Sequence, residues 1–317
     1  MKHLFIVNPA AGPCDRTVQL RSAVEEVFGS RGLDYEVQIT KGPGDETRLA
    51  REAAETGEEL RIYACGGDGT LNGVVNGVVG FDNVAVTHYP AGSGNDFVKC
   101  FDHPEQFRDL EQMLECEEAE LDIIACEGDD HTRYSINICS AGLDARIGTR
   151  IDDYRRLPMV GGKGAYLIST AVNVFRGIHT PFVLEFNGER IDSNQTLICV
   201  CNGRWYGGTF NPVPTAELDD GLLDVLVIKP VNLLQIAGII GKYQQGLFRN
   251  YPDLIRHIRC TEIRVESPEL QVLNVDGEAM STQNVTFRIA EDKLRFFYPA
   301  GLRFRLQESK PAETCAV

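Results

Sequence analysis

A loop with three glycines around an aspartate, Gly66–Thr70 (GGDGT), follows an apolar run and precedes a helix-like segment. Glycine lets the backbone approach a ligand closely, and a loop that leads into a helix N-terminus directs free N–H groups toward an anion. The stretch is neither GxGxxG nor GxxxxGK[ST] and contains no lysine, so neither standard nucleotide fingerprint is matched. These residue types favour a phosphate site, with a purely structural turn as the alternative.

Two further glycine-bearing loops follow strand-like runs, NPAAG at Asn8–Gly12 and PAGSGND at Pro90–Asp96. Ligands of open parallel sheets bind beyond the carboxyl ends of the strands, so three such loops at one edge favour a phosphate site more than any one of them does. Asp68 would repel a triphosphate unless Mg²⁺ intervenes or the carboxylate acts on an acceptor hydroxyl. The other interpretation of Asp68 is a helix N-cap.

These loops require a parallel sheet, and the first part of the chain supplies the pattern for one. LFIVN at Leu4–Asn8, a helical pattern and EVQIT at Glu36–Thr40 form a βαβ unit, and the alternation then repeats. We expect residues 1–122 to form a doubly wound α/β nucleotide-binding domain, with 299–308 as a segment that could complete it.

After Leu121 the pattern changes to many short β-rich runs separated by Gly, Pro, Asn and Asp. This predicts a β-sandwich-like domain over 123–298, with helical inserts at Lys163–Gly177 and Asn232–Phe248 and a frayed tail at 309–317. The apolar residues of Asn232–Phe248 exceed what one buried face needs, so this helix is either buried, packed in a dimer or in contact with a bilayer.

Composition limits the class of partner. The formal net charge of −15 disfavours nucleic acid and repels an anionic membrane, so any phosphate or lipid site must be local. The start, MKHLFIVNPAAG, lacks a secretory pattern, and polar residues interrupt Val231–Phe248, which argues against a membrane span. Ten cysteines without CxxC or zinc-like spacing indicate reduced thiols. We therefore expect a cytoplasmic protein.

The motifs together resemble the diacylglycerol kinase catalytic family, in particular bacterial lipid kinases that share a nucleotide fold with sphingosine and NAD kinases. In the first half the resemblance is carried by NPAAG, GGDGT and PAGSGNDF (Pro90–Phe97), of which GGDGT alone would also fit NAD kinases. The second half is more discriminating and has LD at Leu121–Asp122, NICSAGLDA at Asn137–Ala145, CNGRWYGG at Cys201–Gly208, LDDGLLDV at Leu218–Val225 and DGE at Asp276–Glu278. The resemblance spans nearly the whole chain.

The resemblance implies an ATP site between the two domains, lined by Asn8, Pro9, Ala10, Ala11, Gly12, Thr40, Gly66, Gly67, Asp68, Gly69, Thr70, Leu71, Asn72 and Ser93. It implies that Glu278 accepts the proton of the lipid hydroxyl and that Asp68 holds the magnesium and phosphate geometry. Asp122 and Asp96 would belong to an acidic network that joins the active site to the metal and the domain interface.

The resemblance also implies a second, structural Mg²⁺ at the LDDGLLDV loop. Asp220 would be its side-chain ligand, and the backbone carbonyls of Glu217 and Leu222 would complete the protein contribution. Four residues depart from the family pattern without removing the chemistry. Ser93 keeps the hydroxyl of the usual threonine, Lys99 keeps the charge of a common arginine, and the changes at Tyr89 and Ala91 affect no group that does chemistry.

The activity implied is an ATP-dependent lipid kinase, which transfers a phosphoryl group from Mg-ATP to the hydroxyl of diacylglycerol or a related lipid and forms a phosphatidate-type product. Such an enzyme would make transient peripheral contact with the inner membrane face, and a homodimer is left open. The alternatives are a soluble-substrate kinase of the NAD kinase type and a nucleotide-binding module without catalysis.

Overall fold

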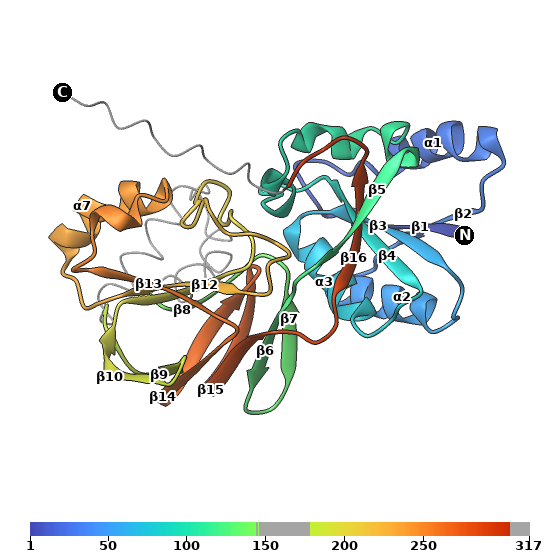
Figure 1. Ribbon diagram of the computed structural model, residues 1–317. Coiled ribbons are helices and arrows are strands. Elements are labelled where there is room, and N and C mark those ends of the chain that lie inside the picture. The colour runs from blue at the N-terminus through green and yellow to red at the C-terminus, as the bar shows by residue number, and fades with distance from the viewer. Residues whose placement is uncertain (144, 146–177, 305–317) are drawn as a thin grey trace, which may run out of the picture.

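The computed structural model describes residues 1–143, 145 and 178–304, which form two domains side by side (Figure 1). The predicted helix Lys163–Gly177 and the predicted tail at 309–317 lie outside the described residues. The α-helices are α1 (Thr17–Val27), α2 (Asp45–Ala54), α3 (Asp68–Val78) and α7 (Leu233–Gln244). Short 3₁₀ turns are η1 (Gly29–Arg31), η2 (Phe97–Cys100), η3 (Pro104–Arg108), η4 (Gln112–Leu114) and η5 (Phe248–Asn250).

The first domain is built on a sheet with the strand order β2-β1-β3-β4-β16-β5. Its strands are β1 (Lys2–Val7), β2 (Tyr35–Ile39), β3 (Leu60–Gly66), β4 (Val84–Pro90), β5 (Cys116–Leu121) and β16 (Leu294–Pro299). Neighbouring strands from β2 to β16 are parallel, and β5 runs antiparallel to β16. Helix α1 lies on one face of the sheet and α2 and α3 on the other, which confirms the doubly wound α/β prediction (Figure 1).

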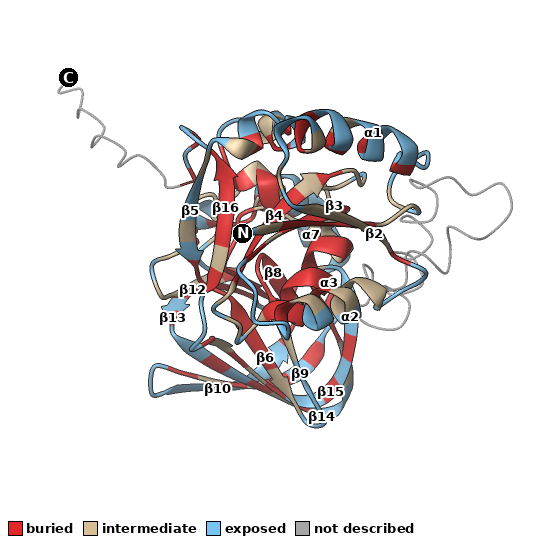
Figure 2. Cartoon of the chain, turned by 90° about the vertical axis from the view of Figure 1, so that its right-hand side faces the viewer, coloured by how far each residue is buried: buried red, intermediate tan, exposed pale blue. Residues whose placement is uncertain are grey.

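Burial in the first domain follows from this layering. The apolar runs of β1, β3 and β4 are covered on both faces and are almost continuously buried, as parallel sheets require (Figure 2). Helix α3 has no charged residue after Asp68 and is buried over most of its length, whereas α1 and α2 expose one side. The carboxyl ends of β1, β2, β3 and β4 therefore meet at one edge of a rigid layer.

The second domain is an antiparallel sheet of ten strands that curls around its own core, as the sandwich-like prediction requires. Its strands are β6 (Ile124–Gly128), β7 (Thr132–Ser135), β8 (Ile138–Gly142), β9 (Thr180–Phe186), β10 (Glu189–Gln195), β11 (Leu197–Cys201), β12 (Leu223–Ile228), β13 (Ile255–Cys260), β14 (Glu262–Val275) and β15 (Glu278–Ile289). The sheet branches at β14, which pairs with β9 through Arg264–Glu266 and with β8 through Leu273–Val275. A register shift between Glu266 and Gln271 separates the two pairings.

The chain passes between the domains twice, from β5 to β6 and from β15 to β16. On its return it inserts β16 between β4 and β5 of the first sheet, although its sequence pattern resembles the short strands of the second half. Arg204 is a further connection between distant segments, because its buried guanidinium donates to the carbonyl oxygens of Ala216, Cys100 and Phe304. The two domains are thereby joined by chain connectivity and by buried polar contacts.

Candidate active site

A cavity of about 840 Å³ lies between the domains at the carboxyl edge of the first sheet. Strand ends and loops of the first domain form one wall, and β8, the turn between β14 and β15, and the loop 206–210 form the other. Of the predicted ATP-binding residues, the cavity wall includes Asn8, Pro9, Ala10, Ala11, Gly12, Thr40, Gly67, Asp68, Gly69, Thr70, Leu71 and Ser93. Gly66 and Asn72 support this wall from behind, since Gly66 ends β3 and Asn72 is buried in α3.

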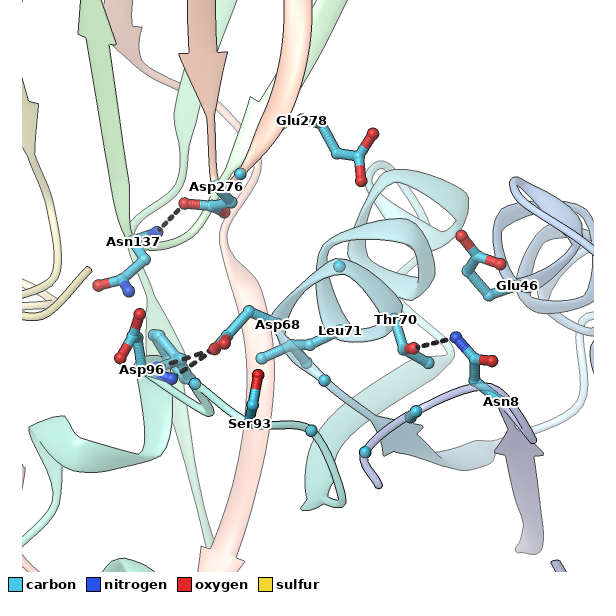
Figure 3. Close-up of a pocket in the computed structure, with 18 of the residues that line it drawn as sticks. Asn8, Glu46, Asp68, Thr70, Leu71, Ser93, Asp96, Asn137, Asp276 and Glu278 are labelled. Carbon is cyan, nitrogen blue, oxygen red and sulfur yellow. Dashed lines mark hydrogen bonds between the residues drawn. The ribbon is translucent and has the colours of Figure 1, made fainter. Parts of the chain in front are cut away.

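The glycine loops are packed against one another by specific contacts. Asn8 Nδ2 donates to Thr70 Oγ1 at 3.1 Å, and the Asn8 side-chain oxygen accepts from the N–H of Ala10 at 3.0 Å (Figure 3). A Cβ on Gly92 would lie 2.5 Å from the Cα of Gly67, a separation at which two carbon atoms clash. The loops after β1, β3 and β4 thus form one continuous surface in front of the N-terminus of α3, where free N–H groups can bind an anion.

Asp68 is the first residue of α3, and Gly67 occupies the N-cap position, so the N-cap interpretation of Asp68 is wrong. Its carboxylate turns toward the neighbouring loop and accepts hydrogen bonds from the backbone N–H groups of Asp96, at 2.5 Å, and Phe97, at 3.4 Å (Figure 3). Burial, with the nearby charge of Asp96 as a second cause, raises the pKa of Asp68 to about 6. A bound cation would therefore stabilise the charged form of this buried carboxylate.

Asp96 connects this corner of the cavity to the second domain. Its carboxylate accepts from Lys99 Nζ at 2.6 Å and from the N–H of Gly208 at 2.9 Å. Lys99 Nζ also donates to the carbonyl oxygen of Gly208 at 2.7 Å. Asp68 and Asp96 thus lie together, as the implied acidic network requires, and the loop 206–210 is anchored to both Asp96 and Lys99.

Glu278 lies across the cavity from these loops. It begins β15, is exposed, and extends its carboxylate toward the N-terminal end of α3 (Figure 3). A Cβ on Gly69 would be 3.5 Å from Glu278 Oε1, so the carboxylate lies close to the loop that would hold a phosphate. The described cavity wall carries the carboxylates of Glu46, Asp68, Asp96, Asp276 and Glu278 but a single basic side chain, Lys41. A polyanion would need a cation to enter this cavity.

Asp276 organises the second wall, a role that the sequence pattern did not predict. Its carboxylate oxygens accept from Ser135 Oγ at 2.7 Å, from Asn72 Nδ2 at 3.0 Å and from the N–H groups of Ile136, Asn137 and Ile138 at 2.9–3.2 Å. Burial raises the pKa of Asp276, and these hydrogen bonds oppose the rise. Asp276 has a positive φ of 49°, a conformation that its surroundings must hold in place. Its hydrogen bonds, one of which comes from Asn72 in α3, therefore fix the turn that carries Glu278.

We expect Asn72→Ala to lower the free energy of unfolding by about 1–3 kcal/mol, because it removes a donor from the enclosed carboxylate of Asp276. Asn72 also donates to the carbonyl oxygen of Tyr134 at 2.8 Å, so the same change loosens α3 from the second domain. Urea unfolding measures the effect. Asn194→Ala, at an exposed position of β10, is the matched control, and equal losses in the two variants would contradict this role.

Comparison with known proteins agrees with the geometry. The model of the diacylglycerol kinase catalytic domain matches residues 2–126, and that of the YegS C-terminal NAD kinase beta sandwich-like domain matches residues 137–298. A protein of Chromohalobacter salexigens described as a "probable lipid kinase YegS-like" is 31% identical over 294 residues, covering 89% of each chain. The chain belongs to the diacylglycerol kinase-like lipid kinase family. It is accordingly a phosphotransferase.

Other relatives of this chain extend the comparison. A diacylglycerol kinase of Bacillus subtilis is 27% identical over 278 residues, covering 86% of this chain and 88% of its own. A solved structure of a diacylglycerol kinase from Bacillus anthracis strain Sterne matches with a TM-score of 0.66 at 20% identity, covering 94% of this chain and 96% of that chain, which shows the common fold. None of the lipid kinase's described helices has the length and apolarity needed to cross a bilayer.

Asp122 lies behind the cavity wall, in the passage from β5 to β6. Its carboxylate is fully buried, is paired with Lys293 and accepts from the N–H of Gly221 at 2.7 Å. Its backbone carbonyl accepts from Asn202 Nδ2 at 2.8 Å. These contacts place Asp122 where the two domains and the LDDGLLDV loop meet. Asp122 therefore holds these segments in position and does not line the cavity.

The side chain of Asp220, the predicted ligand of a structural Mg²⁺, contacts other groups of the chain. One oxygen of Asp220 is paired with Arg259, and the other accepts from the N–H of Leu222 at 3.0 Å. The part of the chain that the structure describes has no group of three or more His, Cys, Asp or Glu residues that could hold a metal. The guanidinium of Arg259 thus pairs with Asp220, and the structural Mg²⁺ stays a prediction.

Proposed function

We propose that this lipid kinase transfers the γ-phosphoryl group of Mg-ATP to the hydroxyl of diacylglycerol or a closely related lipid, with a phosphatidate-type product. The observation that carries the proposal is that Glu278, an exposed carboxylate on one domain, faces the glycine-loop anion site and Asp68 on the other domain across one cavity. Phosphoryl transfer to an alcohol needs positioning, neutralisation of phosphate charge and one acceptor for the hydroxyl proton, and these residues supply the three.

ATP would bind with its phosphates at the N-terminus of α3 and against the loops Asn8–Gly12 and Gly92–Gly94, with Thr40 and Lys41 at the outer edge. Backbone N–H groups and the helix dipole favour the phosphates there. Lys41 is the basic side chain best placed to contact the phosphates, because it is the one cationic group on the described cavity wall. The remaining charge has to be neutralised by Mg²⁺.

Asp68 and Asp96 are the residues that would hold this Mg²⁺, since hard carboxylate oxygens are its preferred protein ligands. Their proximity fits the ion, because the raised pKa of Asp68 reflects a buried carboxylate whose negative charge lacks a nearby cation of its own. When bound, the ion would neutralise phosphate charge and order the triphosphate. Lys99 would keep Asp96 oriented through their ion pair.

The acceptor lipid would enter from the side of the second domain and place its hydroxyl between Glu278 and the γ-phosphate. Glu278 would take the hydroxyl proton while the lipid oxygen forms a bond to the γ-phosphorus and the bond from that phosphorus to the β–γ bridging oxygen breaks, which releases ADP. Asp276 would hold the turn that carries Glu278, and Asp122 would fix the passage between the domains. Contact with the membrane would be peripheral and transient.

The test is to incubate the protein with Mg²⁺ and ATP labelled at the γ-phosphate, and to offer diacylglycerol, monoacylglycerol, sphingosine, ceramide, an isoprenoid alcohol or NAD one at a time. Label in phosphatidate supports the proposal. Label confined to another lipid would overturn the substrate assignment, and label confined to NAD phosphate would support the soluble-substrate alternative. Nucleotide binding without transfer to any acceptor would support a non-catalytic module.

We expect Gly92→Ala to weaken ATP binding by about tenfold, because overpacking of this size typically costs about 1–3 kcal/mol. The added Cβ would lie 2.5 Å from the Cα of Gly67 and would push apart the loops after β3 and β4. Calorimetric titration with a non-hydrolysable ATP analogue measures the affinity. Gly42→Ala is the matched control in the same cavity wall, since a Cβ there meets nothing within 4 Å; an equal loss in both variants would exclude the close approach as the cause.

A further inference from the structure

Helix α7 presents an apolar face to the solvent. Its inward-facing side chains are Ile236, Ile239 and Tyr243. Ile239 and Tyr243 are buried, and Ile236 packs against the core cluster to which Tyr243 belongs. With 3.6 residues per turn, the opposite face carries Leu234, Ala237, Gly238 and Gly241, with Leu233 and Ile240 beside them, and all six are exposed. A surface helix ordinarily has charged or polar residues on this face, so the pattern of α7 requires a partner that accepts apolar side chains.

Exposed large apolar side chains are concentrated here. Among the described residues they number seven, and four of them, Leu233, Leu234, Ile240 and Leu247, belong to α7 and the turn that follows it. Leu234 is the most exposed of all, at 85%. Scattered single residues would need no explanation, but this group forms one surface, which we call the α7 surface.

The charge around the α7 surface is opposite to that of the whole protein. The chain has a formal net charge of −15, yet residues 225–252 contain no Asp or Glu and include Lys229, Lys242 and Arg249, all three exposed. Apolar side chains flanked by basic ones match the interface of an anionic bilayer, where the apolar groups enter the headgroup region and the basic groups meet lipid phosphates. In a two-fold dimer formed through this surface, the same basic side chains of the two copies would face each other, which disfavours a second copy as the occupant.

Helix α7 is also hydrogen-bonded to the loop that forms part of the cavity wall. Tyr243 OH lies 3.2 Å from Tyr206 OH, Gln244 Nε2 donates to Thr209 Oγ1 at 2.9 Å, and the carbonyl oxygen of Gln244 accepts from the N–H of Asn211 at 2.9 Å. Tyr206 and Phe210 line the cavity, and the same loop is held by Asp96 and Lys99 through Gly208. Contact of α7 with a bilayer would therefore place the second-domain wall of the cavity next to the membrane that contains a lipid substrate.

We propose that the α7 surface is the site at which this protein docks on an anionic lipid bilayer, with Leu233, Leu234 and Ile240 inserted at the headgroup level and Lys242 and Arg249 against lipid phosphates. The inference rests on the proposed lipid kinase function, because it places a membrane contact beside the wall through which the acceptor lipid enters. The net negative charge of the protein disfavours contact with an anionic membrane, so the proposal confines this contact to one helix.

The experiment measures vesicle binding by co-sedimentation with the full chain, using vesicles of phosphatidylcholine alone and of phosphatidylcholine mixed with phosphatidylglycerol. We expect binding to the mixed vesicles and about tenfold weaker binding for Leu234→Glu and for Lys242→Glu. Val18→Glu introduces the same kind of change on α1, where Val18 is 78% exposed, and is expected to bind as the unchanged protein does. Equal binding by Leu234→Glu and the unchanged protein would overturn the proposal.

A second measurement separates the docking site from the activity itself. Transfer to a short-chain, water-soluble diacylglycerol should be the same in Leu234→Glu and the unchanged protein, whereas transfer to diacylglycerol in mixed vesicles should fall about tenfold. If the unchanged protein fails to phosphorylate the soluble diacylglycerol, the proposed function fails. If it succeeds and Leu234→Glu retains full activity on vesicles, the docking proposal alone fails.

The oligomeric state in solution tests whether a second copy of the chain, instead of a bilayer, occupies the α7 surface. A dimer that dissociates on Leu234→Glu in sedimentation velocity, with vesicle binding unchanged, would assign the α7 surface to a second copy of the chain and overturn the proposal. A sedimentation coefficient that is the same for the unchanged protein and Leu234→Glu, together with lost vesicle binding, would support it.

Discussion

Glu278→Gln should lower the turnover number for lipid phosphorylation by about a hundredfold to ten-thousandfold, the usual contribution of a positioned general base. The substitution keeps the size of the side chain and removes its capacity to accept the hydroxyl proton. The affinity for ATP should not fall, since the substitution removes a negative charge close to Gly69, in the loop that would hold a phosphate. Steady-state kinetics with labelled ATP and calorimetric titration of the nucleotide measure the two quantities.

Stability provides the check that the Glu278→Gln effect is chemical. Because Glu278 is exposed, its replacement should alter the free energy of unfolding by no more than about 0.5 kcal/mol. Glu262→Gln, an exposed position at the start of β14, is the matched control and should leave turnover unchanged. Near-normal turnover of Glu278→Gln, or an equal loss in Glu262→Gln, would remove Glu278 from the role of base.

Asp68→Asn should abolish most transfer activity and at the same time stabilise the fold. Activity falls because a neutral amide cannot hold the magnesium that the phosphates need. Stability rises by about 1–2 kcal/mol because the buried carboxylate, with its raised pKa and Asp96 nearby, is unfavourable when charged. The amide oxygen can still accept from the N–H groups of Asp96 and Phe97. Enzyme kinetics and urea unfolding in EDTA measure the two effects.

The pH dependence of this stabilisation has a definite sign. Above pH 6 the carboxylate of Asp68 is charged in both the folded and unfolded states, so the unchanged protein carries the full cost. As the pH falls below about 6, the folded state takes up a proton before the unfolded state does, and the cost disappears. The stability difference between Asp68→Asn and the unchanged protein should therefore close below pH 6. A difference that grows on acidification would contradict the assigned environment.

The parts of the fold that could be predicted are those encoded locally. Each glycine loop follows a strand-like apolar run, so the edge at which Asn8, Asp68 and Ser93 meet follows from the rule for parallel sheets. The sequence pattern places the helix after the loop Gly66–Thr70, whereas α3 begins inside that loop, at Asp68. Asp68, Gly69 and Thr70 are weak helix formers, so tertiary contacts decide where the helix begins. Local pattern thus located the cavity but not the orientation of Asp68.

The parts that could not be predicted depend on partners distant in sequence. Asp276-Gly277-Glu278 has the residue types of an ordinary turn, and the hydrogen-bond donors that enclose Asp276 come from Asn72 and from residues 135–138. Likewise, the acidic loop at Asp220 suggests a cation, and the structure supplies one as the guanidinium of Arg259. Side-chain pairs of this kind leave no periodic signal in the sequence.

The position of β16 determines when the first domain can fold. Strands β4 and β5 are made early in synthesis, but β16, which separates them, is made after the entire second domain. Until residues 294–299 leave the ribosome, the edges of β4 and β5 have no partner, and unpaired edges of this kind promote aggregation. The nucleotide-binding half is thus completed last although it begins first. Shortening the chain before Leu294 should accordingly damage the N-terminal domain, not the domain that precedes the cut.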